Sequence, residues 1–98
     1  MVKVENITGY NGNEIVNQFV ITETGRITFQ SYNSTIAIVD FNDKVIYIGK
    51  DYNYSTTTGK YRNIFFSDYA YIPGLSTLKG LEKAMKDGRH NNFRVERL

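Results

Sequence analysis

Few side chains in this 98-residue sequence are of the types that break or form bonds. The sequence has no cysteine, so a thiolate nucleophile, a disulfide and a thiolate metal site are all excluded. The single histidine, His90, lies in a basic polar stretch without a carboxylate that could orient it for a Ser-His-Asp arrangement. Asp40 and Asp43 bracket a predicted hairpin tip, where turn chemistry explains both. The sequence therefore predicts a protein that is not an enzyme and uses neither a cofactor nor a metal.

Two polar clusters are of the kind that bind a ligand without transforming it. Residues 55–60 combine hydroxyls, a lysine and a predicted helix start, which together favour phosphate. The spacing is not that of a P-loop, which needs two glycines before its lysine. A helix cap followed by a polar first turn explains the cluster equally well. Residues 29–34 add hydroxyls and amides, but no partner base.

Basic and aromatic side chains form two further candidate surfaces. Lysines recur at i, i+4 and i+7 of a predicted C-terminal helix, opposite its apolar residues, and arginines follow. A solvated face explains this pattern, and the alternative is a strip that docks phosphates or an acidic protein surface. Residues 50–62 mix tyrosines with basic groups, and such mixtures stack on unpaired bases. The residues predicted to bind a partner are Tyr52, Tyr54, Lys60, Tyr61, Arg62, Lys79, Lys83, Lys86, Arg89 and Arg94.

Composition predicts one folded domain over residues 1–98. The hydrophobic share is 41% and there is a single proline, both of which argue against a disordered chain. The net charge of +2 is too mild for a strongly basic nucleic-acid-binding domain and has the wrong sign for an acidic DNA mimic. The sequence has no apolar stretch of about 18 residues, so we expect neither a membrane span nor a signal peptide, and a cytoplasmic protein.

The elements that position these side chains are mostly strands. Alternating apolar and polar residues predict strands over residues 2–7, 14–22, 26–32 and 93–98. Residues 35–41 and 44–49 form the clearest hairpin. Both of its strands are apolar on two faces, so we expect the hairpin in the centre of the sheet with a helix over one side.

Two helices are predicted after these strands. Ser55 is a suitable N-cap for the first helix, which carries an aromatic face. The second begins at Ser76 or Thr77 and ends at Gly88, a residue suited to a left-handed C-cap. The predicted fold class is α+β: an antiparallel β-meander of about four to five strands, with one or two helices packed on one face.

Four segments of the sequence resemble a family of small uncharacterised proteins that carry a domain of unknown function. These proteins are encoded by phages, prophages and plasmids of low-GC Gram-positive bacteria. The segments are Thr8-Gly9-Tyr10-Asn11-Gly12-Asn13, Asn17-Gln18-Phe19, residues 29–37 and residues 54–62. The likeness covers residues 8–66 well and the tail only loosely. The family has no established activity, so the resemblance assigns no functional residue and implies only a genomic setting.

That setting implies a class of function. Small accessory proteins of such elements often block a host defence enzyme, as anti-CRISPR proteins do, or regulate nucleic-acid transactions. We therefore expect a non-enzymatic phage or mobile-element protein that binds and inhibits a host defence nuclease, such as a CRISPR effector, in the cytoplasm of the bacterial host cell. The alternative is a regulatory protein of the element that binds single-stranded nucleic acid or RNA.

Overall fold

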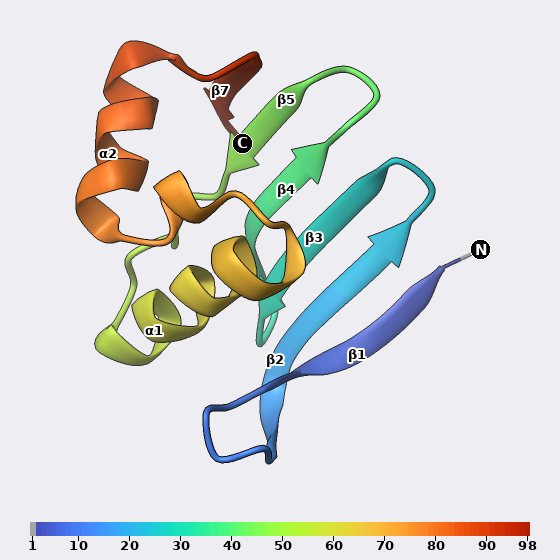
Figure 1. Ribbon diagram of the computed structural model, residues 1–98. Helices are drawn as coiled ribbons and strands as arrows, with labels where there is room; N and C mark the ends of the chain where they lie inside the picture. The colour runs from blue at the N-terminus through green and yellow to red at the C-terminus, as the bar shows by residue number, and fades with distance from the viewer. Residues whose placement is uncertain (1) are drawn as a thin grey trace.

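One seven-stranded sheet organises the chain, with strand order β1-β2-β3-β4-β5-β7-β6 (Figure 1). The computed structural model describes residues 2–98. Its strands are β1 (Lys3–Thr8), β2 (Glu14–Glu23), β3 (Arg26–Ser31), β4 (Ser34–Asp40), β5 (Val45–Ile48), β6 (Arg89–His90) and β7 (Phe93–Arg97). The first five strands pair antiparallel in sequence order, so the predicted meander is present.

Tight turns join the strands of this meander. Gly25 connects β2 to β3 at a φ of 76°, in the left-handed region that glycine tolerates best. A side chain at this position would also collide with the amide of Asn42. The carbonyl of Gly25 accepts a 2.8 Å hydrogen bond from the N–H of Phe41, so this turn is tied to the β4–β5 turn. The two turns therefore fix one end of the sheet.

The C-terminal strands differ from the prediction of a purely antiparallel meander with four to five strands. β7 pairs with β5 in parallel, with Val95 opposite Ile46, so the sheet is mixed and has seven strands. The chain leaves β5, passes through the helices and returns, and such a crossover brings the next strand back in the same direction. The short strand β6, which was not predicted, pairs with the outer side of β7 and forms the edge of the sheet.

The helices follow β5 and lie together on one face of the sheet (Figure 1). They are α1 (Thr56–Ile64), the π-helical turn η1 (Phe65–Tyr69), the 3₁₀ turn η2 (Pro73–Leu75) and α2 (Leu78–Asp87). The predicted caps are confirmed: Ser55 and Thr77 cap the two α-helices, and Gly88 ends α2 at a φ of 74°. Among residues 2–98, no helix is long and apolar enough to cross a membrane.

The core lies between the helices and this face of the sheet. Phe29 of β3 stacks on Phe65 of η1 with ring centroids 5.7 Å apart, and Leu81 of α2 is fully buried in the same cluster. Val39 and Val95 contribute from β4 and β7. Burial of these apolar groups is the main stabilising term, at about 25 cal/mol per Å². The helices are therefore held in place by the sheet face that they cover.

Candidate functional site

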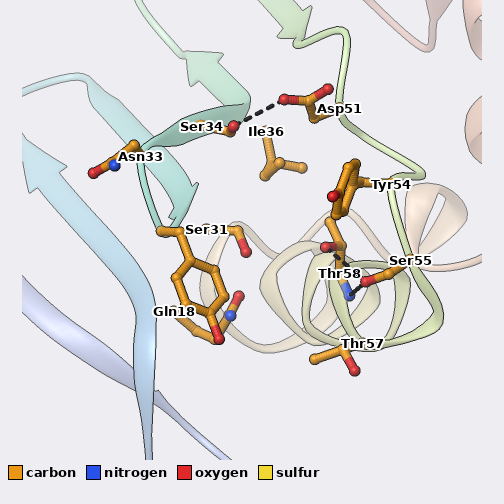
Figure 2. A pocket seen from close by; sticks show the side chains of 11 residues that line it. Gln18, Ser31, Asn33, Ser34, Ile36, Asp51, Tyr54, Ser55, Thr57 and Thr58 are labelled. Atoms are coloured by element: carbon orange, nitrogen blue, oxygen red, sulfur yellow. Dashed lines mark hydrogen bonds between the residues drawn. The ribbon is translucent and has the colours of Figure 1, made fainter.

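A pocket of about 530 Å³ opens between the sheet and the N-terminus of α1 (Figure 2). Residues 29–34 and 55–60, far apart in sequence, supply most of its walls. The lining residues are Gln18, Ser31, Tyr32, Asn33, Ser34, Ile36, Asp51, Tyr54, Ser55, Thr57 and Thr58. Its volume lies within the range of about 300–1,000 Å³ that is typical of small-ligand sites.

Gln18 and Ser31 are two buried polar residues of the sheet wall. They are cross-strand partners in β2 and β3, so their side chains lie next to each other on one face. Gln18 is only 2% exposed, and its Oε1 has no hydrogen-bond partner among residues 2–98. An unpaired buried carbonyl of this kind costs about 1–3 kcal/mol. The sheet wall therefore holds a buried acceptor without a donor, and this oxygen is closed off from solvent.

The helix wall presents donors. The Oγ of Ser55 accepts a 3.1 Å hydrogen bond from the N–H of Thr58, and the Ser55 carbonyl accepts one from Gly59. The N–H groups of Thr56 and Thr57 precede the first helical hydrogen bonds and find no acceptor within α1. Figure 2 shows Ser55 and Thr58 across the pocket from Ser31. The start of α1 and the sheet wall therefore border the same pocket.

The charge of the pocket argues against phosphate. Asp51 is the one charged residue in the lining, and its Oδ2 accepts a 2.8 Å hydrogen bond from the Oγ of Ser34. Lys60, which the sequence offered as a phosphate contact, lies outside the lining; its Nζ is 5.4 Å from the ring centroid of Tyr61 and 5.9 Å from that of Tyr10. A neutral polar ligand suits this site better than an anion.

Two exposed tyrosines stand at the pocket. Tyr32 is 61% exposed and comes from the β3–β4 turn, whereas Tyr54 is 80% exposed and precedes α1. Tyr32 has a φ of 53°, and neighbouring Asn17 has a φ of 63°, in a region that non-glycine residues seldom adopt. The N–H of Tyr32 donates to the carbonyl of Asn17 over 2.7 Å, which holds both residues in place. Backbone strain of this kind often accompanies binding sites.

Two of the predicted partner-binding residues lie in the interior. Tyr61 is 8% exposed and Arg62 is 2% exposed. The Arg62 guanidinium donates to the carbonyl of Tyr52 over 2.6 Å and to the Oδ1 of Asn63 over 3.0 Å. Burial lowers the pKa of Arg62. Both residues therefore support the fold and are not presented to a partner on this surface.

Tyr52 connects this interior to α2. Its hydroxyl donates to Glu82 over 2.8 Å, and this hydrogen bond raises the pKa of Tyr52. The guanidinium of Arg97 lies 5.3 Å from the centre of its ring. Tyr52 therefore joins α2 and β7 to the segment before α1. Tyr54 and Lys60, in contrast, are exposed.

The predicted basic strip begins on α2, where its three lysines, Lys79, Lys83 and Lys86, are exposed. Lys83 pairs with Asp87 over 2.8 Å. The hydrogen bond between them raises the pKa of Lys83 and lowers that of Asp87. Exposed pairs of this type contribute little to stability. The helix therefore presents a solvated basic face whose charge is partly neutralised.

The sheet face opposite the helices carries a second surface, which we name the open face. Strand register places one row across six strands: Val4, Ile21, Thr28, Ile38, Tyr47 and Glu96. Ile21, Ile38 and Tyr47 are half-buried and Val4 is 60% exposed. Both α-helices pack on the other side (Figure 1). The row is therefore an apolar strip that no helix covers among the described residues.

A charged row runs beside this strip. Its charged members are Glu23, Arg26, Asp40, Arg94 and Arg89, and the fully buried Val45 lies between Asp40 and Arg94. Arg89 and Arg94 are direct cross-strand partners, an arrangement in which like charges repel. Arg94 also pairs with Glu96 over 2.9 Å. We call Arg89 and Arg94 the basic corner of the open face. An acidic partner surface would relieve their repulsion.

Within residues 2–98, no three His, Asp or Glu side chains gather closely enough to hold a metal ion. The pocket offers hydroxyls, amides, one carboxylate and two tyrosines. This arrangement can recognise a ligand by hydrogen bonds and stacking. The open face can recognise a protein by apolar contact.

Comparison with known proteins identifies a family and nothing more specific. No curated protein and no solved structure matches the chain. The family match covers residues 2–80, which include every residue that lines the pocket, and it ends in the first turn of α2. Lys83, Lys86, Arg89 and Arg94 lie beyond it. The chain belongs to the family of unknown function DUF8033.

Proposed function

We propose that this protein is a non-enzymatic accessory protein of a phage or other mobile element that binds and inhibits a host defence nuclease. A CRISPR effector is the example we favour, because the sequence resembles small proteins of phages and plasmids. The protein would act by covering a surface that the nuclease needs. The open face is the surface we assign to this contact.

The observation that carries the proposal is the apolar row across the open face. Ile38 and Tyr47 are cross-strand partners on the adjacent strands β4 and β5, and Ile21 lies in the same row on β2, with Thr28 of β3 between Ile21 and Ile38. Apolar side chains that gather on an uncovered face of a small protein are a common mark of an interaction site. A partner of standard interface size, about 800 Å² on each side, would cover several strands of this face.

The basic corner supports a partner with a negatively charged rim. Arg89 and Arg94 are both exposed and lie on the same face as the apolar row. Such a rim would be an acidic patch of the nuclease or phosphates of the nucleic acid that it holds. Peripheral charges of this kind set the association rate and the choice of partner more than the affinity.

An inhibition assay tests the proposal. Cleavage of labelled DNA by a panel of host defence nucleases, including guide-loaded CRISPR effectors, is measured with increasing amounts of the protein. We expect inhibition of at least one nuclease by the wild type. Ile38→Asp should raise the concentration needed by about tenfold or more, as for a residue at the centre of an interface.

A matched control separates this effect from general damage. Asp68 is exposed on η1, on the helix side of the sheet, so Asp68→Asn should inhibit as well as the wild type. The proposal is wrong if every nuclease stays fully active with the wild type. It is also wrong if the Ile38→Asp protein, folded, inhibits without loss.

A second candidate function is direct binding of single-stranded nucleic acid or RNA. The exposed Tyr54 at a polar pocket favours it, because unpaired bases stack on such rings. Binding of labelled oligonucleotides should then weaken steeply as salt rises. The absence of any binding to DNA or RNA at low salt would eliminate this candidate and leave the nuclease proposal intact.

A further inference from the structure

We propose that two copies of this protein associate by antiparallel pairing of their β1 strands, so that one continuous sheet runs through both copies. The inference rests on the outer edge of β1 and not on contact with a nuclease, so it can fail while the proposed function holds, and the reverse. The pairing joins the two open faces edge to edge, because Val4 of β1 lies at the end of the apolar row.

The two edges of the sheet differ in length. β6 forms one edge with only two residues, whereas β1 forms the other edge with six. Within residues 2–98, no strand pairs with the outer side of β1, and the helices leave its N-terminal part uncovered (Figure 1). An edge strand of this length carries backbone N–H and C=O groups that can hydrogen-bond to a further strand. β1 is therefore the edge that can accept one.

The charges on β1 specify which strand fits. Lys3 and Glu5 stand on either side of Val4 in the strand. Antiparallel pairing about a two-fold axis at Val4 places Lys3 of each copy opposite Glu5 of the other. Residues directly opposite each other on antiparallel strands interact, so this register forms two cross-strand ion pairs and one apolar contact between the two Val4 side chains. β1 is thus self-complementary, as an interface between identical surfaces must be.

The same side chains reject the neighbouring registers. A two-fold axis at Lys3 or at Glu5 would place two like charges directly opposite each other, which destabilises a pair of strands. An axis midway between two residues would place Lys3 opposite Val4 or Asn6 and leave the charges unpaired. The β6 edge has only basic side chains, so it offers no opposite charge to a second copy of itself.

The side chains of β1 are accessible for this pairing. Lys3 and Glu5 pair with each other over 3.3 Å, and their side chains are 70% and 35% exposed. Val4 is 60% exposed on the open face. The pairing uses residues 2–6 and so ends before the irregularity of β1 between Asn6 and Thr8. Association therefore exchanges an ion pair within each strand for ion pairs between strands, and it buries Val4.

Sedimentation velocity over a range of protein concentrations tests the inference on the full chain. So short a pairing is smaller than a standard interface, and we expect a weak dimer with a dissociation constant on the order of 100 μM. Lys3→Glu places glutamates opposite each other, and Glu5→Lys does the same with lysines. Each change should raise the dissociation constant by about tenfold or more.

Charge exchange gives the sharpest comparison. The double variant Lys3→Glu, Glu5→Lys restores opposite charges in both facing pairs, so it should dimerise as the wild type does. An equimolar mixture of the two single variants should form a heterodimer at concentrations where each variant alone is monomeric. The matched control is Lys79→Glu, the same charge reversal at an exposed position on α2, which should leave dimerisation unchanged.

Three results would overturn the inference. The first is a wild-type protein that remains monomeric at about 1 mM. The second is a dimer that both single charge reversals leave intact, because association would then use another surface, such as the open face. The third is a double variant that is folded by circular dichroism and does not dimerise. Recovery of the dimer in the double variant and in the mixture supports the inference.

Discussion

The two faces of the sheet are built from alternate residues of the same strands, yet they have opposite roles. On β4, Val39 is fully buried under the helices, whereas Ile38, one residue earlier, is half-buried on the open face. Both are β-branched and apolar, so their chemistry does not distinguish them. Their burial differs because α1 and α2 cover one face of the sheet and leave the other face uncovered. Sequence pattern thus marks a strand as central without telling which face is the core.

The largest effect is expected from a charge placed on the covered face. Val39→Asp puts a carboxylate into the apolar core without a partner and should cost about 4 kcal/mol or more, enough to unfold much of the population. Ile38→Asp should cost about 1 kcal/mol, because its side chain can reach water. Urea denaturation of the two variants measures both losses. Equal losses would show that the open face is also covered.

Substitutions of Arg62 test the covered face in another way, because Arg62 is a buried cation whose hydrogen-bond acceptors are neutral. Arg62→Ala removes the hydrogen bond to the Tyr52 carbonyl and leaves a cavity, so we expect a loss of about 2–4 kcal/mol. Arg62→Met keeps most of the volume and should lose less than half as much. Chemical denaturation compares them. Wild-type stability of Arg62→Ala would mean that the guanidinium has no structural role.

The helix cap beside the pocket should have a smaller effect. Ser55→Ala removes the acceptor of the Thr58 N–H and should lower the free energy of unfolding by about 1 kcal/mol. Thr77→Ala makes the equivalent change at α2, where Thr77 accepts from the N–H of Gly80. Thermal unfolding of both variants gives the comparison. A loss at Thr77 but none at Ser55 would show that α1 is held by packing alone.

The smallest expected change in stability comes from Asp40 on the open face, and it depends on pH. Hydrogen bonds from the Asp43 N–H, and then from Arg26 and the Asn42 N–H, lower the pKa of Asp40 from its ordinary value of 3.8, although burial opposes them. A lowered pKa contributes stability above 3.8, and this contribution is lost as pH falls through the folded-state value. As pH is lowered, the free energy of unfolding should therefore fall less in Asp40→Asn than in the wild type. An unchanged acid profile would exclude this role for Asp40.

Local pattern was enough to place most of the elements. The hairpin of β4 and β5, the caps at Ser55 and Thr77 and the stop at Gly88 were all predicted at or within a residue or two of their observed positions. Each depends on neighbouring residues, such as β-branched runs or a hydroxyl beside free N–H groups. The parallel β5–β7 pair was missed, because its partners are separated by both helices and no local signal encodes such pairing.

The candidate sites were less accessible to prediction. Residues 29–34 and 55–60 were recognised as polar clusters, but nothing in the sequence indicates that they face each other across one pocket. Gln18 was not singled out, although a glutamine inside an alternating apolar strand is a signal that could have found it. Arg62 was predicted to bind a partner, and its helical spacing next to Tyr61 and Ile64 gave only a weak indication of burial.

The sequence by itself determined six of the seven strands, the starts of both α-helices and the end of α2, because each follows from side chains close together in the chain. Only the tertiary structure decided which sheet face is the core, that Arg62 is buried, and that Gln18 lines the same pocket as the start of α1. These are contacts between distant segments. Such contacts form when the apolar surfaces of the helices are buried against the sheet. Because this burial joins residues that are far apart in the chain, no local sequence pattern reveals it.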